Sequence, residues 1–304
     1  MKTILFKGIL NGFDLIGRKF YYNNDLPKDV YSVRNREYSF KSKYNKLDIH
    51  FPEGNTEKLP IMIYIHGGGW TIGNKGNYTK LCQTIANEGF LVFNINYRLG
   101  PKNQHPSQVI DVIDAIKWVK ENYTDYNGDI NQIFLGGDSG GAHLSSLVSC
   151  ILTNENLRKS YNIETPIVKE QLLGLILYYG AYNFDTLIDT GFPAIKIMVK
   201  SYIGTKKPEE SQYIDQISPI DHITKDFPPV FITAGKVDWL YSQTAEMIEE
   251  LDRKGIQYSK LIFDKTTKEA QHAFINFYKR DCTKEAYNAT IEFLKENIKH
   301  SVKI

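Results

Sequence analysis

Residues 132–146, with the sequence QIFLGGDSGGAHLSS, constrain the fold of this 304-residue chain more than any other stretch. The apolar residues before Gly136 predict a buried strand, and the residues after Gly140 predict a helix. Glycines at 137, 140 and 141 remove side chains that would block a sharp bend between the two. Such a bend holds the hydroxyl of Ser139 clear of a sheet at a helix N-terminus, which is the geometry of a nucleophile elbow.

The pentapeptide at 137–141, GDSGG, is also the nucleophile signature of trypsin-like proteases. Those proteases are all-β, carry their histidine and aspartate before the serine, and usually contain several disulfides. In this chain a helix follows the serine, and the candidate aspartate and histidine also follow it. The surroundings of Ser139 therefore exclude that class.

Strands and helices alternate along most of the chain, which predicts a mostly parallel central sheet with helices on both faces. A period-two pattern at Tyr38 and Phe40, and again from Leu47 to Phe51, predicts an antiparallel hairpin before this sheet. The expected strands are 61–65, 91–95, 133–135, 172–179, 230–234 and 258–263, and the expected helices are 106–123, 142–150, 242–254 and about 283–299.

The length of the chain allows one large core, so residues 1–304 are expected to form a single domain. Residues 1–36 show no clear period and are expected to be an N-terminal arm, which either covers an active site or packs elsewhere. Between about 182 and 219 the alternation breaks into an aromatic, lysine-rich insertion that is expected to form a small cap. The insertion carries charges throughout, which disfavours the broad apolar lid of a triglyceride lipase.

The charge balance and the cysteine content indicate which binding partners and which cellular location to expect. The 37 basic and 35 acidic residues are intermixed and form no basic stripe of the kind that indicates nucleic-acid binding. A small-molecule substrate is therefore favoured. The cysteines at 82, 150 and 282 lack metal spacing, and their odd number favours reduced thiols and a cytoplasmic location. Neither a signal peptide nor a membrane span is expected, because the apolar runs are too short or interrupted. The oligomeric state stays open, with a homodimer as one alternative.

A second glycine motif, HGGGW at 66–70, follows the expected strand 61–65. Glycines at a strand's carboxyl end expose backbone N–H groups, and acyl transfer requires such donors aimed at the developing oxyanion. Asp238 follows strand 230–234, and His272 lies in the loop after strand 258–263, so both occupy the end of the sheet where α/β proteins keep their sites. None of the other histidines follows the last strand as His272 does.

Together these motifs resemble the α/β-hydrolase superfamily and, within it, the hormone-sensitive-lipase-like carboxylesterases. The resemblance covers about residues 38–293 and implies an α/β-hydrolase fold with a triad in the order Ser139, Asp238, His272. It further implies an oxyanion hole made by the N–H groups of Gly68, Gly69 and Gly140. Many relatives have alanine at the position of Gly140. Because the donor is the backbone N–H, this difference leaves the implied role unchanged. The motifs that carry the resemblance are HGGGW, Tyr97-Arg98-Leu99 with Pro106 and Asp111, GDSGG, Gly235-x-x-Asp238 and His272-x-Phe274.

The expected function is cleavage of short-chain acyl esters by a serine hydrolase through an acyl-enzyme. An arylformamidase-like amidase and an acetyl-xylan or feruloyl esterase share the motifs and remain alternatives, as does a catalytically silent ligand-binding member of the fold. No cofactor and no metal are expected, because the sequence has no metal motif and no dinucleotide fingerprint. Arg98 and Asp111 are expected to form a structural ion pair outside the site. Four aromatic residues after a strand end either line the pocket or belong to the core: Tyr178, Tyr179, Tyr182 and Phe184.

Overall fold

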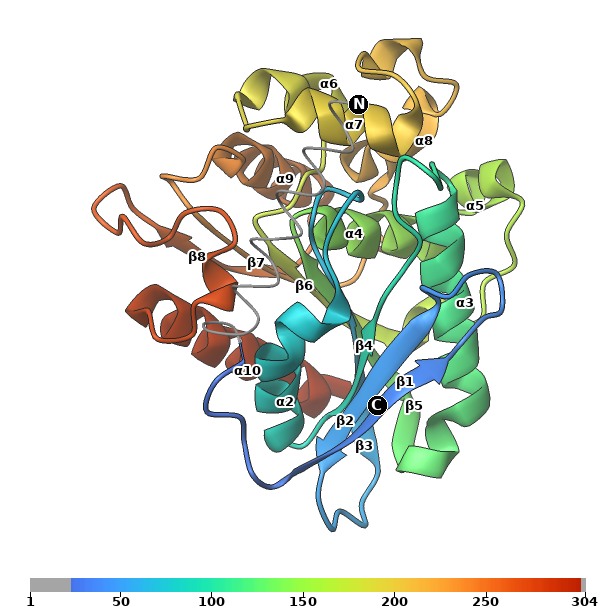
Figure 1. Cartoon of the computed structure of the whole chain (residues 1–304), viewed down its shortest axis with the longest axis vertical. Helices are drawn as coiled ribbons and strands as arrows, with labels where there is room; N and C mark the ends of the chain where they lie inside the picture. Colours follow the sequence, from blue (N-terminus) through green and yellow to red (C-terminus); the bar gives the residue numbers. More distant parts are fainter. Residues whose placement is uncertain (1–22, 302–304) are drawn as a thin grey trace.

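The computed structural model describes residues 23–301, which form one eight-stranded sheet flanked by helices (Figure 1). The strand order is β1-β2-β4-β3-β5-β6-β7-β8; β1 and β2 are antiparallel to their neighbours, and all strands from β4 to β8 run parallel. This is the mostly parallel sheet that the alternating sequence predicts. The strands are β1 (Val30–Glu37), β2 (Lys46–Pro52), β3 (Leu59–Ile65), β4 (Leu91–Ile95), β5 (Gly128–Asp138), β6 (Leu172–Tyr178), β7 (Val230–Gly235) and β8 (Tyr258–Phe263).

Both faces of the parallel sheet are buried, and strand β3 shows how one apolar run serves two cores. Successive side chains of a strand point to opposite faces. Ile61 and Ile63 accordingly belong to one core cluster, and Met62 and Tyr64 belong to the other. Helices α3 (Ser107–Asn122), α4 (Gly140–Thr153) and α9 (Tyr241–Lys254) cover the first face, and α2 (Thr79–Asn87) and α10 (Asp281–Ser301) cover the second. A further short helix, α5 (Glu155–Tyr161), follows α4.

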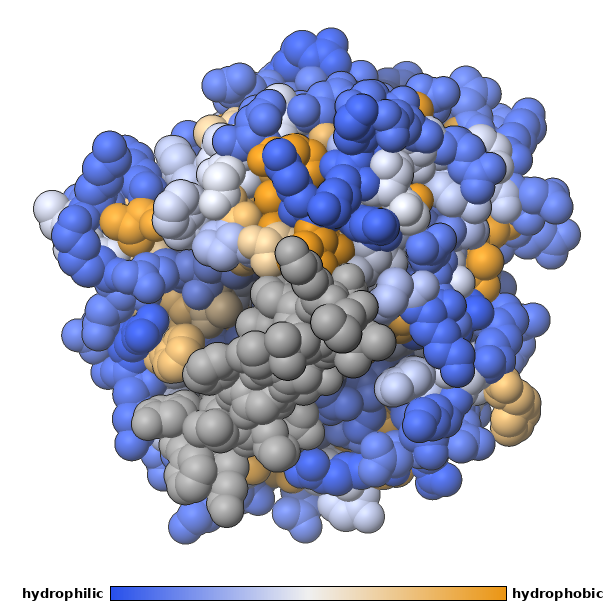
Figure 2. All heavy atoms as spheres, turned by 45° about the horizontal axis from the view of Figure 1, so that its top comes forward, coloured by the Kyte–Doolittle hydropathy of each residue, from blue (hydrophilic) through white to orange (hydrophobic). Residues whose placement is uncertain are grey.

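The segment between β6 and β7 forms a layer of short helices at one end of the sheet, at the top of Figure 1. The face seen in Figure 2 is largely hydrophilic, with apolar residues gathered in a small group near its centre. Among the described residues, no helix combines the length and the apolar character needed to cross a bilayer. The helices of this layer are α6 (Phe184–Leu187), α7 (Ile195–Ile203) and α8 (Ile214–Ile217), with the 3-10 turns η5 (Ile188–Thr190), η6 (Pro208–Glu210) and η7 (Pro219–His222).

The predicted antiparallel hairpin exists, but the position of its first strand was wrong. The strand that pairs with β2 is β1, Val30–Glu37, and not the stretch around Tyr38 and Phe40. Phe40 is 95% exposed in the turn, whereas Tyr38 is buried with its hydroxyl donating to the carbonyl of Asn96. An edge strand with only partial burial shows little apolar alternation, which explains why the sequence VYSVRNRE did not reveal it. Residues 1–22 of the predicted arm lie outside the described residues.

Candidate active site

Ser139 occupies the sharp turn between β5 and α4. Its backbone has φ 49° and ψ −118°, a conformation that a non-glycine residue adopts only when the surrounding structure holds it. The Ser139 N–H donates to the carbonyl of Tyr178 at 2.9 Å. A Cβ atom on either Gly137 or Gly141 would overlap the carbonyl oxygen of Ile65 at the end of β3. Glycine is therefore required on both sides of Ser139 by the close approach of strand, turn and helix.

Three predicted site residues meet at the carboxyl end of the sheet. Ser139 Oγ lies 2.9 Å from His272 Nε2, and His272 Nδ1 lies 2.9 Å from Asp238 Oδ2. An ionised carboxylate only accepts, so Nδ1 carries the proton and Nε2 is left to accept the serine hydroxyl. The Asp238 side chain is fully buried, and that of His272 is 18% exposed. The rings of Tyr179 and Phe192 pack edge-on to the imidazole, at centroid distances of 4.9 and 4.7 Å.

The glycine loop after β3 faces the same point. Gly68, Gly69 and Trp70 have φ of 109°, 55° and 58°, so three successive residues are left-handed. Backbone of this kind turns sharply, and glycine adopts it without steric cost. Gly140 begins α4, where the N–H groups have no partner within the helix. A Cβ on Gly140 would lie 3.3 Å from the nitrogen of Gly69, so this loop and the helix start are in contact.

Asp138, directly before Ser139, has a place in the site that the sequence reasoning missed. Its side chain is buried and accepts hydrogen bonds from the Gly67 N–H at 2.8 Å, the Tyr78 hydroxyl at 2.9 Å and the Tyr64 hydroxyl at 3.3 Å. Burial raises the pKa of Asp138 to about 6 and outweighs these donors, which lower it. The carboxylate ties the glycine loop to the nucleophile turn. A charged residue ending an otherwise apolar strand was the available signal.

A cavity of about 240 Å³ opens beside Ser139 and His272. The glycine loop, the nucleophile turn and the loop after β8 form most of its wall, and Phe192 and Met198 come from the segment between β6 and β7. Of the two alternatives for the aromatic cluster after β6, the structure shows the core and not the pocket lining. Tyr178, Tyr179, Tyr182 and Phe184 are fully buried, and none of them lines this cavity.

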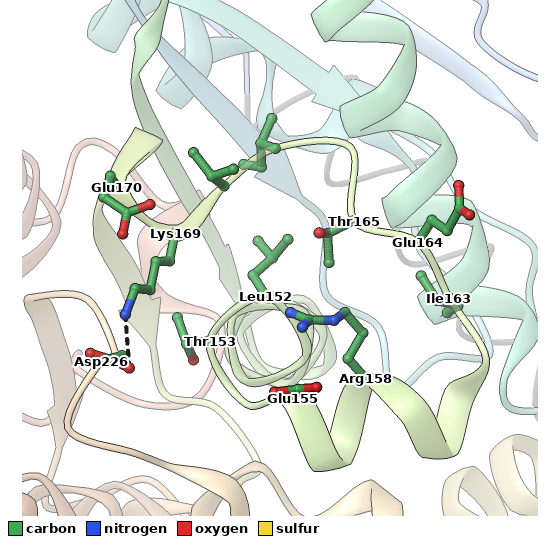
Figure 3. A pocket seen from close by; sticks show the side chains of 12 residues that line it. Leu152, Thr153, Glu155, Arg158, Ile163, Glu164, Thr165, Lys169, Glu170 and Asp226 are labelled. Carbon is green, nitrogen blue, oxygen red and sulfur yellow. Dashed lines mark ion pairs between the residues drawn. The ribbon is translucent and has the colours of Figure 1, made fainter.

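A larger hollow of about 750 Å³ lies near the C-terminal end of α4 and does not contain any predicted site residue. Its lining mixes charges of both signs, and Lys169 pairs with Asp226 at 2.9 Å (Figure 3). Size alone therefore does not locate the chemistry in this molecule. The smaller cavity is the candidate site, because it brings together the serine, the histidine and the glycine loop.

Arg98 and Asp111 form the predicted structural pair. The guanidinium approaches the fully buried carboxylate to 2.8 Å, and the Arg98 N–H donates to the same carboxylate at 2.7 Å. The pair joins the loop after β4 to α3 and lines no part of the site cavity. Cys82, Cys150 and Cys282 are buried and not bonded to one another.

The fold is that of an α/β-hydrolase. It combines a mostly parallel sheet, helices on both of its faces, and a sharp turn at Ser139 between a strand and a helix. The chain belongs to the BD-FAE family, whose model matches residues 47–251. The resemblance seen in the sequence is thereby confirmed at the level of fold and family.

Comparison with known proteins gives relatives that are named as ester hydrolases. A probable carboxylic ester hydrolase, LipM of Mycobacterium tuberculosis, is 33% identical over 228 residues, which cover 72% of this chain and 50% of the relative. A probable isoprenylcysteine alpha-carbonyl methylesterase of Oryza sativa is 29% identical over 60% of this chain and 41% of its own length. The chain thus spans about half the length of the curated relatives it matches.

Solved structures share the fold over nearly the whole chain. Esterase B of Lactobacillus rhamnosis superposes with a TM-score of 0.88 at 20% identity, covering 99% of this chain and 95% of that one. A hyperthermophilic esterase of Pyrobaculum calidifontis gives a TM-score of 0.75 at 22% identity, covering 97% and 94%. At these identities the likeness establishes the α/β-hydrolase fold that the sequence predicts.

Proposed function

We propose that this protein is a serine carboxylesterase that cleaves short-chain acyl esters. The single observation that carries the proposal is the continuous hydrogen-bonded path from Asp238 through His272 to Ser139, facing a cavity lined by the glycine loop. The names of the relatives as ester hydrolases support the reaction class. A silent binding protein of this fold has no need to keep all three residues in contact.

In the proposed mechanism Ser139 Oγ attacks the acyl carbonyl while His272 Nε2 takes its proton. Asp238 holds the imidazole in the required tautomer and stabilises its positive charge. The N–H groups of Gly68, Gly69 and Gly140 bind the oxyanion. The imidazolium then protonates the leaving alcohol, and a water activated by the same histidine releases the acid and restores the serine.

The cavity supports a short acyl group. Its volume of about 240 Å³ lies below the roughly 300–1,000 Å³ of common ligand pockets, so it suits a small group. The acyl chain shares this space with the start of the alcohol, which limits it to roughly six carbons. We assign residues 182–219 as the cap of a single catalytic domain, because Phe192 and Met198 close the cavity from that segment. The unpaired cysteines favour a reducing, cytoplasmic setting.

The test combines a substrate panel with covalent labelling. Purified protein is assayed on p-nitrophenyl esters from two to twelve carbons and on N-formylkynurenine, and a fluorophosphonate probe is mapped by peptide mass spectrometry. We expect hydrolysis of the short esters and labelling at Ser139, with both lost in Ser139→Ala. Turnover of N-formylkynurenine alone would favour the amidase, and preference for feruloyl or acetylated xylan substrates would favour those esterases. A protein that hydrolyses nothing and labels nowhere would refute the proposal.

A further inference from the structure

Trp70, the residue after Gly69, is held in an unusual conformation by rings from three helices. It is 1% exposed and left-handed, with φ 58°, which a bulky residue adopts only under constraint. Tyr202 stacks on its indole at 4.5 Å and 15°, and Phe184 packs at 5.5 Å. His143 meets the indole edge-on at 5.1 Å and accepts its Nε1–H at 3.0 Å. The conformation of the glycine loop thus depends on contacts outside the loop.

Two of these three rings belong to the cap, and one face of helix α7 covers the loop. Met198 and Tyr202 are four residues apart on α7 and therefore share a face. The Met198 side chain lies against Gly69, where a Cβ would overlap its sulfur, while Tyr202 stacks on Trp70. A single helical face of the cap thus presses on two consecutive residues of the oxyanion loop.

Two of the three rings around Trp70, those of Tyr202 and His143, are themselves anchored by hydrogen bonds. The Tyr202 hydroxyl bonds His105 Nδ1 at 2.8 Å, and the Tyr202 carbonyl accepts the His105 N–H at 2.8 Å. His143 accepts from the indole through Nδ1, so its Nε2 carries the proton and donates to the Ile217 carbonyl of α8 at 2.8 Å. These bonds fix the stacked arrangement relative to the cap.

We propose that Tyr202 is a positioning residue for the reaction: through its stack on Trp70 it keeps the Gly69 amide directed at the oxyanion. Without the stack, Trp70 can relax to a negative φ. This rotates the Gly69–Trp70 peptide and thereby displaces Gly69 together with the N–H that it carries. The cap is then part of the machinery that stabilises the transition state, besides closing the cavity. This inference rests on the proposed esterase function.

The test compares Tyr202→Leu, which removes the ring, with Tyr202→Phe, which keeps the stack and loses only the hydroxyl. For p-nitrophenyl butyrate we expect Tyr202→Leu to lower kcat about tenfold or more while KM changes less than about twofold, since misdirecting a donor affects mainly the transition state. Its affinity for a trifluoromethyl ketone, which forms an oxyanion with the serine, is expected to fall by the same factor as kcat/KM. Tyr202→Phe keeps the ring and the backbone hydrogen bond from the His105 N–H, so its kcat and KM are expected to stay within about twofold of wild type.

Near-ultraviolet circular dichroism and thermal unfolding identify variants that fail to fold. If Tyr202→Leu does not fold, Phe184→Leu removes the other cap ring from Trp70, and the same loss of kcat is expected. A folded Tyr202→Leu with wild-type kcat, or with equal losses in Tyr202→Phe, would overturn the inference while leaving the esterase proposal intact. Absence of ester hydrolysis in the wild-type protein would instead overturn the proposed function.

Discussion

Replacing Asp138 with asparagine tests whether burial or hydrogen bonding has the larger effect on the pKa of this carboxyl group, which directly precedes the nucleophile. The side chain is buried and accepts bonds from the Gly67 N–H and the hydroxyls of Tyr64 and Tyr78. Burial favours the protonated form, and the three donors favour the ionised form. In this structure burial is the larger effect, and it raises the pKa of Asp138 to about 6 from its usual 3.8.

The raised pKa has a defined consequence for stability. Between pH 4 and 6 the folded protein holds a proton on Asp138 that the unfolded chain has released, so the contribution of Asp138 is fully present below pH 4 and is lost as the pH rises through about 6. At 1.36 kcal/mol per pH unit the total change is about 3 kcal/mol. The amide of an asparagine does not titrate, so Asp138→Asn is expected to gain stability relative to wild type by about this amount over the interval.

The assay is urea unfolding of both proteins at intervals from pH 4 to 7, followed by tryptophan fluorescence. Titrating groups that do not interact with Asp138 cancel in the difference between the two free energies of unfolding, because both proteins carry them. Asp125→Asn, which makes the same chemical change at an exposed aspartate, serves as the control. A difference for Asp138→Asn that stays constant with pH would mean that the donors balance burial, and one that shifts in favour of wild type as the pH rises would mean that they outweigh it. Either result would refute the reasoning.

Three further outcomes are expected. Asp238→Asn is expected to leave the protein folded but to lower kcat about 10⁴-fold, since the amide favours the wrong imidazole tautomer; a loss below about tenfold in steady-state assays would contradict the assigned role. The value of kcat/KM is expected to rise about fourfold for each added methylene, from about 0.8 kcal/mol apiece, and to stop rising near six carbons; a continued rise to twelve carbons, or interfacial activation on an emulsion, would mean that the cap opens into a lipase lid. Gly137→Ala is expected to destabilise the fold by about 1–3 kcal/mol in urea unfolding, because its Cβ would overlap the Ile65 carbonyl; an unchanged midpoint would show that the turn can relax.

Local patterns were sufficient for several parallel strands and for helix α3. The strands Leu91–Ile95 and Tyr258–Phe263 have the predicted ends, and helix α3 differs from its predicted range by one residue at each end. Edge strand β1 was not predicted, because a partly exposed strand carries few apolar residues. Helix α2, which directly follows a 3-10 turn, was not predicted either. The chain order of Ser139, Asp238 and His272 was readable, since each follows a strand of a parallel sheet whose carboxyl ends meet at one edge.

The sequence by itself determined the α/β architecture, the glycine-flanked serine turn and the three residues that meet there. These follow from backbone rules that act over a few residues: alternation in strands, the space that glycine leaves, and the shared edge of parallel strands. Only the tertiary structure decided that Asp138 joins the turn to the glycine loop, that Tyr182 and Phe184 belong to the core, and that Tyr202 holds Trp70. Those contacts join segments separated by about 70 to 130 positions, and their burial depends on how the cap packs over the sheet, which no local pattern encodes.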